Sequence, residues 1–176
     1  MTRRNEAVAD RTVVEPRPTF EDFYRREFRP VVALAYALTG SRVGAEDLAQ
    51  EAFLAAHQRW DRIGEYDKPE AWVRRVLSNM AVSAFRRRAA ETRALARLAL
   101  QRQEALPALE PPDAQFWGAV RSLPPRQAQA VALFYLEDRP IAQIADILDC
   151  SPSTAKVHLF RGRQSLAAAL SMEAAE

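Results

Sequence analysis

The residues that could carry out covalent or metal chemistry are few. The chain has 176 residues, with one cysteine, Cys150, and two histidines, His57 and His158, far apart in sequence. One cysteine cannot form an internal disulfide or a cysteine-rich zinc site, and two distant histidines disfavour a histidine metal cluster. Asp47 and Glu51 share a helix face, but no pocket pattern accompanies them as paired acid and base. We therefore expect no enzyme, no metal and no cofactor.

The residues that can bind a polyanion are more numerous, and they are segregated along the chain. The formal net charge is only +2, but residues 42–67 carry three basic and six acidic side chains. Residues 68–103 carry nine basic and two acidic ones, and residues 150–170 carry three basic and no acidic ones. A single basic stretch is usually a solvated face. Two of them, on helices with apolar stripes, favour a polyanion partner such as nucleic acid.

The elements that must position these residues are helices. Apolar residues recur at helical spacing, and no convincing alternating strand pattern appears. No apolar run approaches the ~20 residues that a membrane span needs, and residues 1–18 lack the apolar segment of a secretory signal. We expect an all-α protein of the cytoplasm, without membrane insertion.

The proline pattern divides this helical chain into two small domains. Residues 104–113 contain Pro107, Pro111 and Pro112 and predict a linker that spans at most ~35 Å. The expected parts are a flexible N-terminal arm (1–18), a first helical domain (19–103), the linker (104–113) and a helix-turn-helix domain (114–172). Pro30 is expected to bend or restart the helix that begins near Phe20.

A helix expected over residues 43–60 has an apolar face and an acidic outward face. The outward residues include Asp47, Gln50, Glu51 and Leu54. A lone exposed leucine is ordinary, but Leu54 lies among polar residues at helical spacing and could anchor a partner helix.

After a loop over residues 61–68, Pro69 opens a long helix at the favoured first-turn position. One face carries Arg75, Asn79, Ser83 and Arg86, and Arg87 follows. Arginines at these positions can track phosphates, while Asn79 and Ser83 can hydrogen-bond an unstacked base. The alternative is a solvated helix whose arginines pair with nearby carboxylates.

Near the C-terminus, two short helices flank a tight turn at Asp149 and Cys150. Ser151 is the expected N-cap and Pro152 the first helical residue, which together predict a helix-turn-helix. The outward residues of its second helix are Ser153, Thr154, Lys156, Val157, His158, Phe160 and Arg161. Cationic side chains can donate to guanine, hydroxyls can contact a base or a phosphate, and Val157 can touch a thymine methyl group. An ordinary helical hairpin is the alternative.

Three stretches in order resemble segments of bacterial sigma factors. Their core-polymerase-binding segment resembles AEDLAQEAFLAA (45–56), and their −10-reading helix is similar to PEAWVRRVLSNMAVSAFRRR (69–88). Their −35-reading helix-turn-helix resembles LPPRQAQAVALFYLEDRPIAQIADILDCSPSTAKVHLFRGRQSL (123–166). The order, spacing and short linker are similar to the extracytoplasmic-function group of the sigma-70 family, and the resemblance covers residues 20–170.

The resemblance implies a subunit that binds core RNA polymerase and directs initiation at −10 and −35 elements of promoter DNA. It implies that Asp47, Gln50 and Glu51, joined by Leu54, dock on the β′ clamp helices, and that the β flap is a second polymerase contact. Asn79 and the loop 61–68 would capture a flipped −10 base, and the arginines of the long helix would hold the backbone. The outward helix-turn-helix residues would contact the −35 element. An anti-sigma factor is a further implied partner.

Four positions depart from the family pattern. Ser83 stands where aspartate is common, Asp149 where glycine is common, and Val157 and His158 replace serine and arginine. Two other functions stay open at this point. One is a stand-alone helix-turn-helix regulator that dimerises through residues 20–100 and binds duplex DNA without polymerase. The other is an enzyme with a DNA-binding tail, which the lack of a catalytic constellation disfavours.

Overall fold

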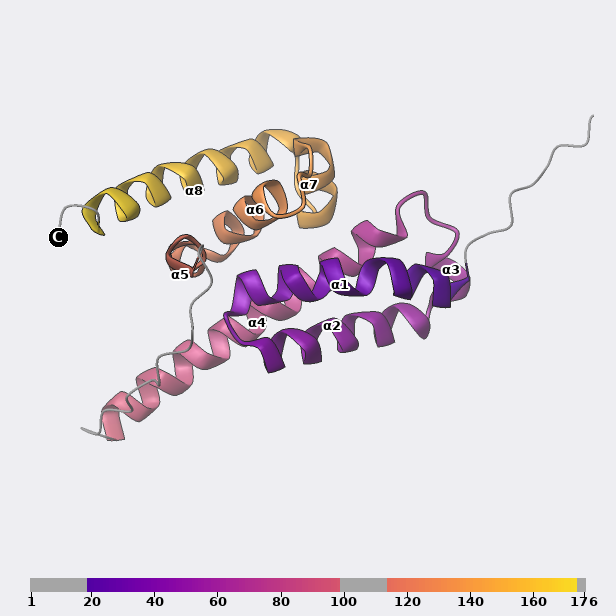
Figure 1. The fold of residues 1–176 in the computed structure, drawn as a ribbon, viewed down its shortest axis with the longest axis horizontal. Coiled ribbons are helices and arrows are strands. Elements are labelled where there is room, and N and C mark those ends of the chain that lie inside the picture. Colours follow the sequence, from indigo (N-terminus) through magenta and orange to yellow (C-terminus); the bar gives the residue numbers. More distant parts are fainter. Residues whose placement is uncertain (1–18, 99–113, 174–176) are drawn as a thin grey trace, which may run out of the picture.

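The computed structural model describes residues 19–98 and 114–173, which form eight α-helices and no strand within those ranges (Figure 1). Side chains are described for residues 19–84 and 114–171. The expected arm (1–18) and linker (104–113) lie outside the described residues. The helices are α1 (Phe20–Thr39), α2 (Arg42–His57), α3 (Trp60–Ile63), α4 (Pro69–Leu98), α5 (Ala114–Ser122), α6 (Pro125–Tyr135), α7 (Ile141–Leu148) and α8 (Pro152–Glu173). The all-α prediction is confirmed for the described residues.

In the first half of the chain, α1 and α2 form an antiparallel pair against α4 (Figure 1). The turn between them uses Gly40 at φ +69°, a left-handed conformation that suits glycine. Ser41 then caps α2, because its hydroxyl accepts a hydrogen bond from the Gly44 amide at 3.2 Å. Rings of Phe20, Phe23, Tyr24, Phe28, Phe53 and Trp60 pack between these helices. The aromatic cluster fixes the α1–α2 pair on which α4 rests.

Two expected boundaries in this half are wrong. Pro30 neither ends nor restarts α1, which runs unbroken from Phe20 to Thr39. Proline removes one backbone hydrogen bond from the helix. The helix continues because Val31 and Leu34, in the turn after Pro30, are fully buried and tertiary packing stabilises it. The helix expected to end at residue 60 ends at His57, and a separate short helix, α3, begins at Trp60. This break directs the Trp60 ring against Phe23, at a centroid distance of 4.9 Å.

In the second half, α7 and α8 flank the predicted tight turn. Asp149 adopts the left-handed conformation at φ 55° and ψ 53°, and its amide bonds back to α7. The Ser151 hydroxyl accepts a hydrogen bond from the Thr154 amide at 3.1 Å, so Ser151 caps α8, and Pro152 is its first residue. The expected helix-turn-helix geometry is confirmed.

The inner face of α8 packs closely on α6. Ala155, Leu159, Gly162 and Leu166 are buried along it, as their spacing predicts. A Cβ atom on Gly162 would lie 2.7 Å from Cγ2 of Val131, so the helices approach more closely than any larger residue would allow. This contact holds α8 with its opposite face turned outward.

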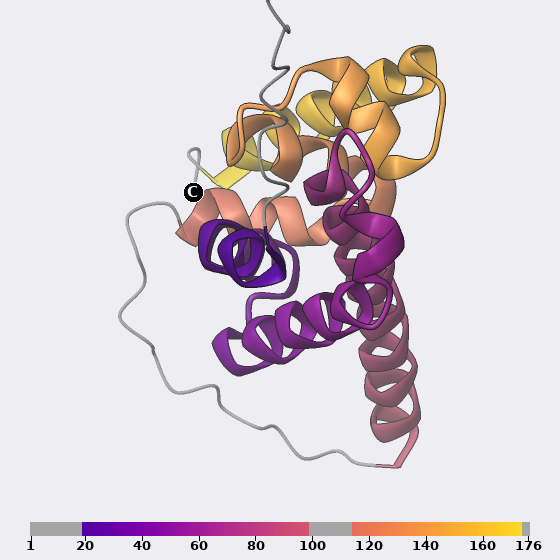
Figure 2. The same cartoon turned by 90° about the vertical axis from the view of Figure 1, so that its right-hand side faces the viewer.

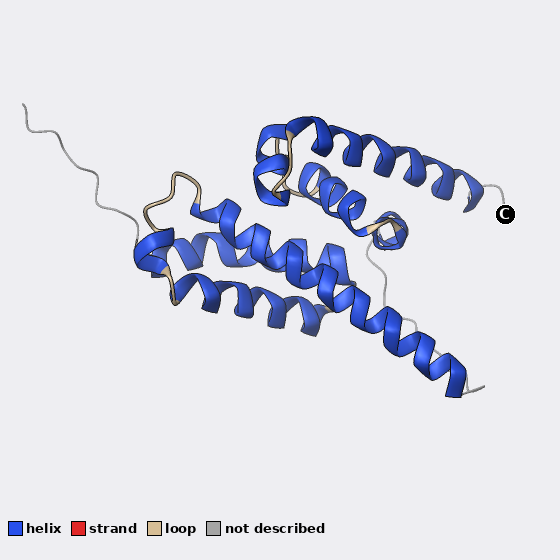
Figure 3. Ribbon diagram, turned by 180° about the vertical axis from the view of Figure 1, so that it is seen from behind, coloured by secondary structure: helices blue, strands red, loops and turns tan. Residues whose placement is uncertain are grey.

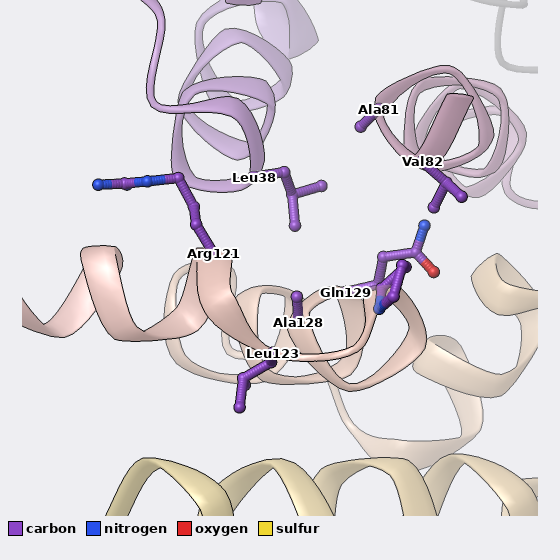
Figure 4. Close-up of a pocket in the computed structure, with 8 residues that line it drawn as sticks. Leu38, Ala81, Val82, Arg121, Leu123, Ala128 and Gln129 are labelled. Carbon is purple, nitrogen blue, oxygen red and sulfur yellow. The ribbon is translucent and has the colours of Figure 1, made fainter. Parts of the chain in front are cut away.

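The two halves are packed against each other rather than held apart. α1 contacts α5 and α6, and α4 contacts α7, so the buried side chains of both halves form one continuous hydrophobic cluster (Figures 2 and 3). The predicted division into two domains is confirmed, and the two domains are in direct contact. Apolar side chains that would otherwise face water explain this contact, because Leu38 and Val82 of the first half and Ala128 of the second half line one small pocket between them (Figure 4). The pocket left there is about 20 Å³, far smaller than the roughly 300 Å³ of a small-molecule site.

One buried arginine joins the two halves. Arg74 of α4 is 1 % exposed. Its Nη1 donates to Oε2 of Glu27 in α1 at 2.9 Å, and its Nε donates to Oε2 of Glu137, which follows α6, at 2.6 Å. Arg139 donates to the same oxygen of Glu137 at 3.2 Å. We call Arg74, Glu27 and Glu137 the interdomain ion triad.

Burial and pairing act in opposite directions on the triad. Burial alone would raise the pKa of Glu27, but the hydrogen bonds and charges of Arg26 and Arg74 outweigh it and hold that pKa below 4.5. Burial would likewise lower the pKa of Arg74, but the hydrogen bonds and charges of Glu137 and then Glu27 outweigh it and raise that pKa above its ordinary value. The contribution of Glu27 to stability is therefore complete above pH 4.5 and is lost as the pH falls through its lowered pKa.

We predict that Arg74→Met lowers the free energy of unfolding by about 3–5 kcal/mol, because Glu27 and Glu137 lose their shared buried partner and keep only the more exposed Arg26 and Arg139. Urea unfolding followed by circular dichroism measures this loss. The matched control is Arg25→Met, which breaks the Arg25–Glu21 pair, whose side chains are both 70 % exposed. That change should cost at most about 1 kcal/mol.

A third variant covers the case in which Arg74→Met does not fold. Combining Arg74→Met with Glu27→Gln and Glu137→Gln removes all three charges and should recover most of the lost stability. Equal unfolding midpoints for Arg74→Met and Arg25→Met would contradict the assignment of the triad as a buried ionic link.

Candidate nucleic-acid interface

The structure brings the four expected polymerase-docking residues together on one face of α2. Asp47, Gln50, Glu51 and Leu54 are all exposed, because Ala45, Ala49, Ala52, Phe53 and Ala56 turn the opposite face into the core. Val43 is also exposed and extends this row by one turn. The sequence pattern did not predict that Val43 belongs to this face, because the residue lies at the start of the helix. The result is an acidic surface with an apolar side chain at each end.

Two of the expected −10 residues lie beside this surface. Asn79 and Ser83 are exposed on α4, and with Leu48, Glu51 and Met80 they line a shallow hollow between α2 and α4. The Ser83 hydroxyl donates to the Asn79 carbonyl at 3.1 Å, which leaves the Asn79 side chain as the freer polar group. Arg86 and Arg87 belong to α4, but their side chains lie outside the described residues.

Arg75, the third expected −10 residue, faces the other half of the molecule. Its Nη1 lies 3.4 Å from Oδ1 of Asp149, and its Nη2 donates to the Asp146 carbonyl. Lys68, in the loop before α4, lies 3.5 Å from Oδ2 of the same Asp146. Both cationic side chains are half-exposed, and exposed pairs of this kind contribute roughly 0–1 kcal/mol each. These two contacts are therefore readily exchanged for other anions.

The outward face of α8 lies on the side of the second half away from α1 and α2 (Figure 1). Lys156, Val157, Phe160 and Arg161 are exposed there. The hydroxyls of Ser153 and Thr154 each lie 2.8 Å from the Ser151 hydroxyl, so these two expected contacts already share a local network at the helix start. Every expected −35 residue is thus at the surface except His158, which is half-buried.

The charge of His158 is set by its surroundings. Partial burial, and then the positive charges of Arg126 and Arg161, lower its pKa below 6.5. The imidazole is therefore neutral at neutral pH, so one ring nitrogen can accept a hydrogen bond while the other donates. This residue differs in charge, and not only in size, from the arginine that is common at its position in sigma factors.

Sequence reasoning missed the cationic residues that have structural roles. Arg74 and Arg75 are adjacent and of one residue type, but the structure buries the first and leaves the second half-exposed. Arg126 donates to the Leu148 carbonyl at 3.0 Å and so holds the end of α7. Arg163 lies over the Phe134 ring, 4.5 Å from its centroid. No local pattern marks these cations as structural, because their partners are distant in sequence.

Within the described ranges, no three histidine, cysteine or acidic side chains gather in a way that could hold a metal ion. Among the helices described, none is both long and apolar enough to cross a membrane.

Comparison with known proteins identifies both halves. Residues 23–91 match the family described as Sigma-70 region 2, and residues 113–166 match Sigma-70 region 4. The ECF RNA polymerase sigma factor SigW of Bacillus subtilis is 25% identical over 150 residues, which cover 77% of this chain and 80% of that protein. The ECF RNA polymerase sigma factor SigE of Mycolicibacterium smegmatis is 28% identical over 161 residues, which cover 85% of this chain and 60% of that protein.

Solved structures show the same fold. The sigma factor RpoE of Bartonella quintana, in complex with the anti-sigma factor NepR, aligns with a TM-score of 0.66 and 24% identity over 86% of this chain and 96% of that one. CnrH, in complex with the cytosolic domain of CnrY, aligns with a TM-score of 0.61 and 20% identity over 87% of this chain and 88% of that one.

The chain matches region 2 and then region 4, and it aligns with ECF sigma factors over most of its length. These matches support one family assignment. The chain belongs to the extracytoplasmic-function group of the sigma-70 family, the non-enzymatic subunits that direct RNA polymerase to initiate transcription at promoters.

Proposed function

We propose that this chain binds core RNA polymerase through the outward face of α2 and reads its promoters with α4 and α8. Asp47, Gln50, Glu51 and Leu54 dock on the β′ clamp helices, and the β flap supplies a second contact. Arg75, Asn79, Ser83, Arg86 and Arg87 engage the −10 element, and the outward residues of α8 engage the −35 element. The observation that carries the proposal is the exposure of an acidic face on α2 and a basic face on α8, in two halves that each match a sigma region.

Reading both elements at once requires the two halves to separate. The elements are about 25 base pairs apart by their names, which is roughly 85 Å of duplex at about 3.4 Å per base pair. In the closed chain, Arg75 of α4 lies 3.4 Å from Asp149, in the turn just before α8. The same contacts occupy Arg75 and Lys68, which could otherwise meet promoter phosphates. Core polymerase therefore opens the chain, and the protein alone binds promoter DNA weakly.

The closed form, in which the two halves are in contact, could also be the form that a regulatory partner binds. An anti-sigma factor that prefers it would keep the chain from polymerase. Support comes from RpoE, whose structure contains the anti-sigma factor NepR, and from CnrH, whose structure contains the cytosolic domain of CnrY. The proposed site of action is the cytoplasm, because core polymerase and promoter DNA are the partners proposed for this chain.

The direct test is run-off transcription with purified core polymerase on promoter fragments recovered by mapping where the protein and polymerase sit together in the genome. We predict a transcript that depends on this chain and on the mapped start site. Loss of both transcription and core binding would contradict the assignment of function to this chain.

Gel shifts distinguish the alternative of a stand-alone regulator. Such a regulator would shift duplex promoter DNA tightly without polymerase. The proposed sigma factor should shift it only weakly alone and strongly in the holoenzyme. Tight binding by the protein alone, unchanged by core polymerase, would favour the regulator.

We predict that Asp47→Ala and Gln50→Ala each weaken the binding of core polymerase by about tenfold, because contacts at the centre of an interface carry most of its energy. Fluorescence titration with labelled protein measures the dissociation constant. Circular dichroism should be unchanged, since both side chains are exposed. Glu21→Ala, at an exposed acidic position on α1, is the matched control. Wild-type affinity in the α2 variants would refute the docking surface.

A further inference from the structure

The centre of the outward face of α8 is apolar. With about 100° of rotation per residue, the direction opposite the buried row of Ala155, Leu159, Gly162 and Leu166 is occupied by Val157 and Phe160, between Ser153 and Gln164. Val157 is 44 % exposed and Phe160 is 61 % exposed. An isolated exposed apolar residue needs no explanation, but two neighbours on the outward face of the first half of α8 do.

The surroundings of this pair favour DNA over protein as the group that covers it. Lys156 and Arg161 are exposed on either side, and residues 150–170 contain no acidic residue. Such a surface attracts phosphates, and the charges would flank the pair in a major groove. The polar groups nearest the helix start are already engaged, because Ser153 and Thr154 share hydrogen bonds with Ser151. The residues left to meet base edges at the centre are Val157 and Phe160.

Among the groups exposed in the major groove, the apolar one is the C5 methyl group of thymine. Residues three apart on a helix are separated by about 4.5 Å along its axis, and successive base pairs are separated by about 3.4 Å. Val157 and Phe160 can therefore meet methyl groups on adjacent base pairs. Gly162 packs closely against Val131, so α8 lies on α6 with this pair facing outward.

We propose that Val157 and Phe160 form a thymine-methyl-reading pair, and that the −35 element of this sigma factor contains two neighbouring A·T pairs whose thymine methyl groups contact it. The inference rests on the proposed −35 role of α8 and goes beyond it, because it assigns base identity to two side chains. Since Val157 stands where serine is common in the family, the preference belongs to this chain.

The experiment uses full-length holoenzyme and a promoter that it transcribes in the run-off assay. Each thymine of the −35 region, on either strand, is replaced in turn by deoxyuridine, which removes only the methyl group. At two neighbouring base pairs we expect the substitution to weaken holoenzyme binding by about three- to tenfold. Substitutions at other base pairs of the element should have no effect.

Protein variants identify the side chain behind each effect. Phe160→Ala should abolish the sensitivity to deoxyuridine at one of the two base pairs, and Val157→Ala at the other. Lys156→Ala is the matched control, because loss of a phosphate contact should weaken thymine and deoxyuridine templates equally. Both apolar side chains are exposed, so the variants should fold, and unchanged core binding confirms it.

Three outcomes would overturn the inference. A holoenzyme that transcribes normally but is insensitive to deoxyuridine throughout the −35 region leaves the sigma assignment intact and removes the methyl-reading pair. Retained sensitivity in both alanine variants assigns the methyl contact to other residues. If Phe160→Ala and Val157→Ala instead weaken only the binding of a protein partner, the apolar pair is a protein-docking surface. Failure of the proposed function is separate, since it would appear as no promoter-dependent transcript at all.

Discussion

The arrangement of the whole chain depends on the pairing of one buried charge. Arg74 lies where α1, α4 and the second half meet, and it must be paired because an isolated guanidinium in a dry interior is strongly unfavourable. Glu27 anchors it within the first half and Glu137 ties it to the second. When the halves separate, Arg74 keeps Glu27 and gains water in place of Glu137. Separation of the halves therefore leaves no buried charge without a partner. Deletion of the arginine, by contrast, removes the buried partner of both Glu27 and Glu137.

Around this link, the interface combines strong and weak contacts. The Gln129 side chain donates to the Ser78 carbonyl at 2.7 Å, and apolar side chains of α1, α4 and α6 exclude water beside it. The half-exposed pairs of Lys68 and Arg75 with Asp146 and Asp149 contribute little, and both involve cations suited to phosphate. The interface is thus strongest at residues with no proposed DNA contact, and weakest at the cationic residues that the proposed function needs for DNA binding.

The sequence was sufficient to predict the helices, the caps and the helix-turn-helix, because these depend on local chemistry. Ser151 and Pro152 start α8 as their residue types require, and the row from Ala155 to Leu166 is buried as its spacing predicts. Asp149 adopts the left-handed conformation that its place in the turn demands. The outward residues of α2 and α8 follow from the same periodicity, which is why their exposure could be predicted.

What could not be predicted depends on contacts between distant residues. Arg74 and Arg75 are adjacent and chemically identical, yet a rotation of about 100° along the helix buries the first and leaves the second half-exposed. The two carboxylates that pair with Arg74 lie 47 and 63 positions away. Pro30 remains inside α1 because tertiary packing outweighs a local preference. The contact between the two halves likewise depends on the surfaces that face each other, and it cannot be predicted from the composition of the linker alone.

The most direct measurement of this account is the distance between the two halves before and after polymerase binds. With Cys150→Ser as the background, cysteines at the exposed positions Glu21 and Ser165 carry a donor and an acceptor dye. The account predicts efficient energy transfer in the free chain and its loss in the holoenzyme on promoter DNA, where the reading helices stand roughly 85 Å apart. Equal transfer in the two states would show that the halves do not separate, and would contradict the account.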